Sequence, residues 1–89
     1  MEKKWSVYIV RCADDTLYTG VALDVEKRVL AHNEAKTGAK YTKSRRPVTL
    51  LYTENGFTRG EALSREVVLK KMPRQAKISL LKTRQKAIL

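Results

Sequence analysis

The sequence has few of the residues that interrupt or cross-link a chain: one cysteine, two prolines and four glycines among 89 residues. A lone cysteine, Cys12, cannot form an internal disulfide, which fits the reducing cytoplasm, and we interpret it as a small buried hydrophobe. No run approaches the ~18 apolar residues of a membrane span, and the first residues lack the apolar stretch of a secretory signal. We therefore expect a cytoplasmic protein without a membrane-spanning segment. The length predicts a single domain over residues 1–89, with its core at about residues 4–81 and a basic C-terminal tail.

Acidic residues are also scarce. Nine Asp and Glu stand against 19 Lys and Arg, so the formal net charge is +10. Residues 36–46 hold five basic residues and no acidic one, and the chain after Glu66 holds seven and again no acidic one. Basic faces are often only solvated surface, but two such blocks in a small domain create a positive potential suited to phosphate backbones. We expect salt-sensitive binding of nucleic acid. The candidate contact residues are Lys40, Lys43, Arg45, Arg46, Lys70, Lys71 and Arg74.

The spacing of apolar residues predicts an α+β fold. Strands are expected over residues 5–11, 17–21 and 48–53, and helices over 24–36, 58–72 and 75–86. Asp24 is a suitable N-cap, Gly38 a helix stop, and Thr58-Arg59-Gly60-Glu61 a capping box. The order β-β-α-β-α-α predicts a small three-stranded antiparallel sheet flanked by helices.

Glu66 is difficult to explain by structure alone. Its neighbours at three and four residues are Ala62, Leu63, Leu69 and Lys70, so Glu66 lies in an apolar stripe that should face the core. A carboxylate is costly there unless it is paired, protonated or bound to a metal. A pair with Lys70, in the favourable order, would explain it without any function.

Arg28 and His32 lie one turn apart on the first expected helix, beside the apolar pair Val25 and Val29. From that position both can reach over the edge of the sheet. A lone histidine is more often a partly buried structural residue than a catalyst. The presence of Arg28 on the same face leaves both interpretations open.

Tyr8 and Tyr18 are expected on adjacent strands of a hairpin, on one face of the sheet. Paired tyrosines at such positions usually serve only cross-strand packing. Gly20, two residues later, weakens its strand and indicates a bulge or a place where another group approaches the backbone.

Taken together, these residues resemble the GIY-YIG nuclease superfamily. The segment Val7-Tyr8-Ile9, followed by Leu17-Tyr18-Thr19-Gly20, is similar to its paired tyrosine motif, with Val7 and Thr19 as departures. Arg28 follows the second tyrosine by ten residues on a capped helix, and Glu66 lies on a later helix, as the family's arginine and metal-binding carboxylate do.

The resemblance extends from about Lys4 to Leu81. Within it, three further segments are similar to the branch of short GIY-YIG proteins made of one module. These segments are His32-Asn33, Gly38-Ala39-Lys40-Tyr41-Thr42 and Arg45-Arg46-Pro47-Val48.

The resemblance implies a GIY-YIG endonuclease-like fold and hydrolysis of a phosphodiester with one divalent ion, Mg²⁺ or Mn²⁺. Glu66 would be the metal ligand and Arg28 would hold phosphate oxygens. Tyr8 or Tyr18 would orient or deprotonate the attacking water; we favour Tyr8, with His32 as its proton acceptor. A phenol with a pKa near 10 needs nearby positive charge to act as a base.

The resemblance is incomplete at two positions. Family members often carry Lys shortly after the second tyrosine motif, where this chain has Val21, and Asn beyond the metal-binding Glu, in the region of Ile78. The alternative to a nuclease is therefore a nucleic-acid-binding protein with a vestigial site. For the enzyme we expect DNA in preference to RNA, structure-selective or weakly selective cleavage, and a possible protein partner that supplies target choice.

Overall fold

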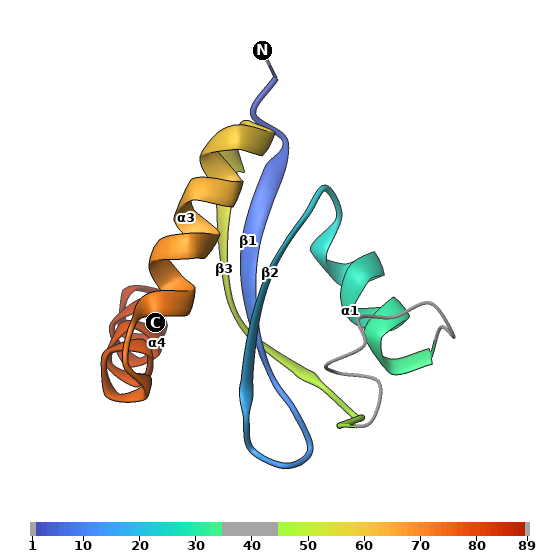
Figure 1. The fold of residues 1–89 in the computed structure, drawn as a ribbon, viewed down its shortest axis with the longest axis vertical. Helices are drawn as coiled ribbons and strands as arrows, with labels where there is room; N and C mark the ends of the chain where they lie inside the picture. Colours follow the sequence, from blue (N-terminus) through green and yellow to red (C-terminus); the bar gives the residue numbers. More distant parts are fainter. Residues whose placement is uncertain (1, 35–44, 89) are drawn as a thin grey trace.

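The computed structural model describes the backbone of residues 2–34 and 45–88, and side chains as far as residue 82. Within these residues, three strands form one antiparallel sheet in the order β2-β1-β3, and three helices accompany it (Figure 1). In chain order the elements are β1 (Trp5–Arg11), β2 (Leu17–Ala22), α1 (Val25–Glu34), β3 (Thr49–Phe57), α3 (Arg59–Lys71) and α4 (Arg74–Ile88). The predicted α+β class and the predicted element order are confirmed.

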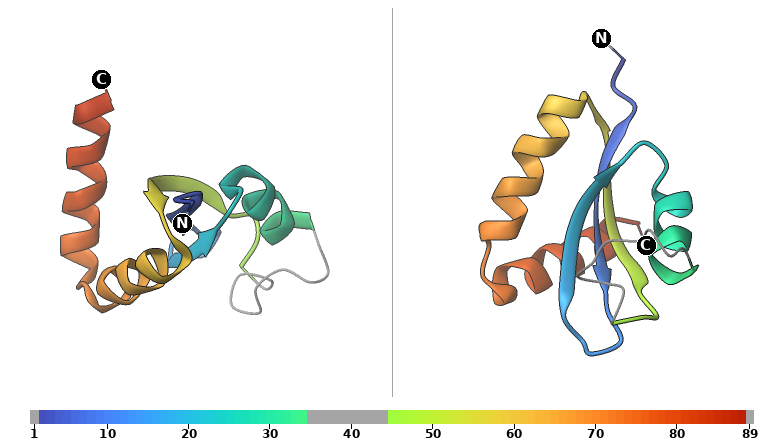
Figure 2. Two further views of the ribbon diagram at one scale, coloured as in Figure 1. Left: turned by 90° about the horizontal axis from the view of Figure 1, so that it is seen from above. Right: turned by 45° about the vertical axis from the view of Figure 1, so that its right-hand side comes forward.

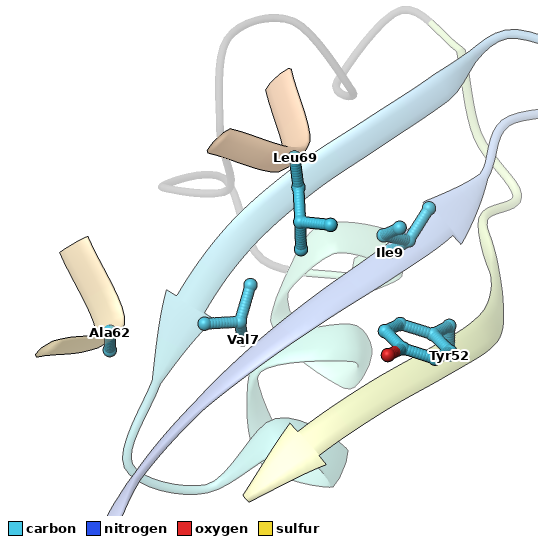
Figure 3. Packing of buried hydrophobic residues seen from close by; sticks show 5 residues of the cluster. All are labelled: Val7, Ile9, Tyr52, Ala62 and Leu69. Atoms are coloured by element: carbon cyan, nitrogen blue, oxygen red, sulfur yellow. The ribbon is translucent and has the colours of Figure 1, made fainter. Parts of the chain in front are cut away.

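The sheet separates two apolar layers because its side chains alternate between two faces. Val7 and Ile9 of the central strand point toward α3, where they pack with Tyr52, Ala62 and Leu69 (Figure 3). The intervening side chains form a second cluster, consisting of Tyr8, Val10, Cys12, Ala22 and Val48, against which Val25 and Val29 of α1 pack. Helices therefore cover both faces, with α3 on one side and α1 on the other (Figures 1 and 2). Cys12 is buried, as predicted.

Local capping explains where the helices begin. The Asp24 carboxylate accepts a hydrogen bond from the backbone N–H of Lys27 at 3.1 Å, which satisfies one free donor in the first turn of α1. Thr58 and Glu61 form both hydrogen bonds of the predicted capping box. At the other end of α3, Met72 is extended and precedes Pro73. The expected end of α1 at Lys36 and the stop at Gly38 lie outside the described residues.

The third strand is longer than predicted. It starts at Thr49 and ends at Phe57, four residues beyond the expected end at Thr53. Two register shifts against β1 give it bulges, and Gly56 adopts a φ of +90° there, a conformation that favours glycine. Side-chain contacts hold the added residues in the sheet, because Ser6 Oγ donates to Asn55 Oδ1 at 2.6 Å and Arg65 binds both carboxylate oxygens of Glu54.

Candidate active site at the edge strand

Tyr8 and Tyr18 lie on the face of the sheet that α1 covers. In the β1–β2 register Tyr8 pairs with Gly20 and Val10 pairs with Tyr18, so the tyrosines are diagonal neighbours. Gly20 permits this arrangement: a Cβ atom built at Gly20 would lie 2.5 Å from the Tyr8 hydroxyl oxygen. The group that approaches the backbone at this glycine is therefore the Tyr8 phenol.

His32 connects both tyrosines to α1. Its side chain is fully buried, and its Nε2 lies 2.7 Å from the Tyr8 hydroxyl oxygen. Its ring centroid is 5.9 Å from that of Tyr8 and 5.4 Å from that of Tyr18. Arg46 Nε donates a hydrogen bond to the His32 carbonyl oxygen. The histidine is thus held at its ring and at its backbone.

Burial sets the resting protonation of this pair. It lowers the pKa of His32, and the positive charges of Arg28 and Arg46 lower it further. Burial also raises the pKa of Tyr8, with smaller contributions from Tyr18 and Glu66 in the same direction. Hydrogen bonding to Arg28 and its charge act in the opposite direction on Tyr8. At neutral pH both groups are therefore neutral, and the phenol can donate to the unprotonated imidazole nitrogen.

Arg28 and Glu66 belong to helices on opposite faces of the sheet, and each affects the pKa of Tyr8. Arg28 is an exposed residue of α1, near enough to Tyr8 to lower its pKa. Glu66 belongs to α3 on the opposite face, yet its charge contributes to the raised pKa of Tyr8. The structure thus joins Tyr8 and Tyr18 to His32 by direct contacts, and it relates Arg28 and Glu66 to Tyr8 through their effects on its pKa. The convergence of all five groups on one surface stays a prediction.

The Glu66 carboxylate is largely buried, with its side chain 18% exposed, and one oxygen lies 3.5 Å from Lys70 Nζ. The expected pair with Lys70 is therefore present. Lys70 is half-exposed, and an i,i+4 pair of this kind contributes only about 0.3–0.5 kcal/mol. Lys70 is therefore a weak partner for this carboxylate.

A metal ion at this site would depend on Glu66 as its protein ligand. Within residues 2–34 and 45–88, no three His, Cys, Asp or Glu side chains gather closely enough to hold an ion. A carboxylate is the hard oxygen donor that Mg²⁺ and Mn²⁺ prefer, and Mg²⁺ commonly binds through one or two carboxylates, water and substrate phosphates. The residues present fit such an ion only when the substrate completes its coordination.

The residues predicted to contact nucleic acid differ in their surroundings. Arg45 Nε lies 2.9 Å from Asp14 Oδ2, and Arg74 lies 3.4 Å from Asp15, so the β1–β2 turn binds a residue of each basic block. Lys71 is exposed on the last turn of α3. Lys40 and Lys43 lie outside the described residues.

Asn33 has a role that the sequence did not predict. Its amide accepts from Val48 N at 2.6 Å and donates to Val48 O at 3.1 Å, as a paired strand residue would. These bonds fix the end of α1 to the start of β3 and so hold His32 beneath the sheet. In the sequence, Asn33 was singled out only as part of the His32-Asn33 segment that is similar to short GIY-YIG proteins.

Comparison with known proteins identifies the family. The family model described as the GIY-YIG catalytic domain matches residues 4–79. The chain belongs to the GIY-YIG family. Every described side chain of the candidate site lies within the matched region.

Other short GIY-YIG proteins resemble this chain over nearly its whole length. A UPF0213 protein of Staphylococcus saprophyticus is 52% identical over 81 residues, which cover 91% of this chain and 96% of that protein. A UPF0213 protein of Desulfotalea psychrophila is 46% identical and covers 92% of this chain, with 74% of its own length matched.

Two solution NMR structures share the GIY-YIG fold described above. A protein of E. faecalis is 40% identical with a TM-score of 0.61, over 96% of this chain and 92% of that one. The UPF0213 protein of Bacillus halodurans is 35% identical with a TM-score of 0.57, over 89% and 83%. Among the described helices, none has the length and apolar character needed to cross a bilayer.

Proposed function

We propose that this GIY-YIG protein is a metal-dependent nuclease that hydrolyses phosphodiester bonds, in DNA in preference to RNA. The observation that supports this most directly is the buried hydrogen bond between Tyr8 and His32, in a position where the charges of Arg28 and Glu66 both act on the pKa of Tyr8. The largely buried Glu66 carboxylate lies on α3 and Arg28 lies on α1, so charged groups from two helices influence one phenol.

Arg28 is the proposed phosphate ligand. It is exposed on the first turns of α1, and its guanidinium presents a fixed fork of donors to the non-bridging oxygens. Glu66 would hold Mg²⁺ or Mn²⁺ together with water and phosphate oxygens. A bound ion supplies charge neutralisation at the phosphate and stabilises the leaving oxygen.

Tyr8 is the proposed base, with His32 as its proton acceptor. In water, transfer of a proton from a phenol to an imidazole is uphill by about 5 kcal/mol, because their ordinary pKa values differ by about 3.5. Burial shifts both pKa values so as to increase that difference, and Arg28 lowers the pKa of Tyr8. The pair therefore needs additional positive charge near Tyr8 to become a base at neutral pH. Tyr18, which is only half-buried, would orient the attacking water.

We propose that the protein has little selectivity for nucleotide sequence. Lys and Arg contacts to phosphate position nucleic acid but carry little sequence information. We expect structure-selective or weakly selective cleavage by a single domain in the cytoplasm, with a partner protein as a source of further selectivity.

The decisive experiment changes Glu66 to Gln. This variant keeps the shape of the side chain and removes the charge that would bind the ion. We expect cleavage of a panel of flaps, nicks, branched and single-stranded substrates in Mg²⁺ or Mn²⁺ to fall by orders of magnitude, and metal-free binding to stay near wild type. Loss of the pair with Lys70 should cost at most about 0.5 kcal/mol of stability.

Glu61→Gln is the matched control. It makes the same substitution on the same helix, and Gln also serves in a capping box, so cleavage should remain. Metal-dependent cleavage retained by a folded Glu66→Gln protein would falsify the metal-ligand role. A wild type that binds nucleic acid but cleaves no substrate with either metal would favour the binding protein with a vestigial site.

A further inference from the structure

A groove of about 470 Å³ opens directly beside the candidate active site. It lies where β1 begins, β2 ends and α1 starts. Its walls include Trp5, Val21, Leu23, Lys27, Arg28 and Ala31. Arg28, the proposed phosphate ligand, therefore belongs to both the site and the groove.

The groove combines apolar surface with positive charge. Leu23 is 61% exposed and takes no part in either apolar cluster, so packing of the core does not explain it. Trp5 is only half-buried: part of it packs against the apolar cluster beneath α3, and the guanidinium carbon of Arg59 lies 5.8 Å from its ring centroid, so the remainder of the side chain lines the groove. Asp24, the acidic residue in the wall, accepts the capping hydrogen bond from Lys27 N. An occupant should thus be planar or apolar and attached to negative charge.

We infer that this groove binds the nucleobase adjacent to the phosphate held by Arg28, stacked on Trp5 and covered by Leu23. This rests on the proposed function only in the assignment of a phosphate to Arg28. A nucleotide joins an aromatic face to an anion, which matches a wall of Trp5 and Leu23 next to Lys27 and Arg28. The volume is within the range of about 300–1,000 Å³ typical of small-molecule sites.

The inference narrows the substrate class. A base can stack on a protein side chain only when it is unpaired, as in single strands, flaps and splayed ends. Stacking on an aromatic ring tolerates any base, because every base has a π-face. The groove would therefore favour unpaired nucleotides next to the cleaved bond without selecting a sequence.

Trp5 is the sole tryptophan of the chain, so its fluorescence reports on the groove directly. The test titrates metal-free protein with a single-stranded oligonucleotide and with an abasic oligonucleotide of equal length and charge. We expect quenching of Trp5 fluorescence by the first and binding without comparable quenching by the second. Leu23→Ala should weaken binding of the base-containing strand about fivefold. Leu30 lies on α1, is similarly exposed at 54% and is not part of this wall. Leu30→Ala should therefore leave the affinity for the base-containing strand unchanged.

Equal quenching by the abasic strand, or an unchanged affinity in the folded Leu23→Ala protein, would overturn the inference. So would a fluorescence change that depends on protein concentration alone, since the groove would then bind a second copy. Because no metal is present, the result is independent of whether Glu66 supports cleavage. If the protein cleaves nucleic acid but shows no base-dependent quenching, the proposed function stands and only the nucleobase site is rejected.

Discussion

The hydroxyl oxygen of Tyr8 lies 2.7 Å from Nε2 of His32, and neither side chain has more than 1% of its surface exposed. The hydrogen bond joins the central strand to α1 across the inner surface of the sheet. Because both groups are buried, loss of either partner leaves a polar atom without water, at a cost of about 1–3 kcal/mol. The same contact therefore contributes to stability and to the proposed chemistry.

The first prediction concerns Gly20, which makes room for the Tyr8 phenol. Gly20→Ala places a Cβ atom 2.5 Å from the hydroxyl oxygen and must displace the ring from His32. We expect a loss of about 1–3 kcal/mol in the free energy of unfolding, and strongly reduced cleavage. Urea denaturation and a cleavage assay would measure the two effects.

Gly60→Ala is the control for that experiment. A Cβ at Gly60 meets nothing within 4 Å, and the residue lies in α3, where alanine is preferred. Stability should stay constant or rise by up to about 1 kcal/mol. If Gly20→Ala behaves as Gly60→Ala does, the close approach of Tyr8 is not a constraint on the fold.

The second prediction is a pH dependence from His32, the one histidine of the chain. Its pKa in the folded protein lies below 6.5, so the unfolded chain binds the proton more readily. Its stabilising contribution is thus complete above pH ~6.5 and is lost as pH falls through the lowered folded pKa. Urea midpoints between pH 8 and pH 5 should fall in wild type, and cleavage should fall with them, as His32 becomes charged.

His32→Gln removes the titration while keeping a side chain that can accept from Tyr8. Its midpoint should vary less over the same range. The pKa values of the Asp14 and Glu61 carboxyls are also lowered, chiefly by hydrogen bonds from Thr16 and from the Thr58 backbone, which moves their titration further from this window. Identical pH profiles for wild type and His32→Gln would contradict the assignment.

The third prediction concerns Arg45 and Arg46, which were expected to hold nucleic acid. Their double removal would also delete the hydrogen bond to the His32 carbonyl, so a cleaner change is Asp14→Asn. Asn retains Oδ1, which accepts from Thr16, but removes the negative charge facing Arg45. Binding should strengthen, and the slope of log K against log salt should steepen by up to about 0.9.

Asp15→Asn is the comparison. It changes the net charge equally, and Asn tolerates the positive φ of 69° at this position. Its pair with Arg74 is longer and more exposed, so the effect on binding should be smaller. Equal effects from both variants would mean that net charge, and not the position of Arg45, governs binding.

Local signals in the sequence predicted most of the fold. The capping box at Thr58 and the cap at Asp24 fixed two helix starts, and period-two alternation predicted the β1–β2 hairpin. The positions of Tyr8 and Tyr18 on two strands joined by a short turn predicted that both lie on one face of the sheet. These features depend on neighbours within a few residues or on one short turn, so the local sequence is enough to predict them.

Long-range contacts accounted for what was missed. The extension of β3 depends on Ser6 and Arg65, which lie far from Asn55 and Glu54 in sequence. The ion pair between Asp14 and Arg45 joins residues 31 apart, so no local pattern in the sequence indicates it. Helical spacing placed Glu66 near the core, but its electrostatic effect on Tyr8 acts between two elements that are far apart in the sequence.

The paired hydrogen bonds between Asn33 and Val48 join two positions that lie 15 residues apart in the sequence. They fix the end of α1 to the residue before β3, next to the position of His32. Substitution of Asn33 would therefore loosen the anchor of His32 without removing any group that takes part in the proposed chemistry.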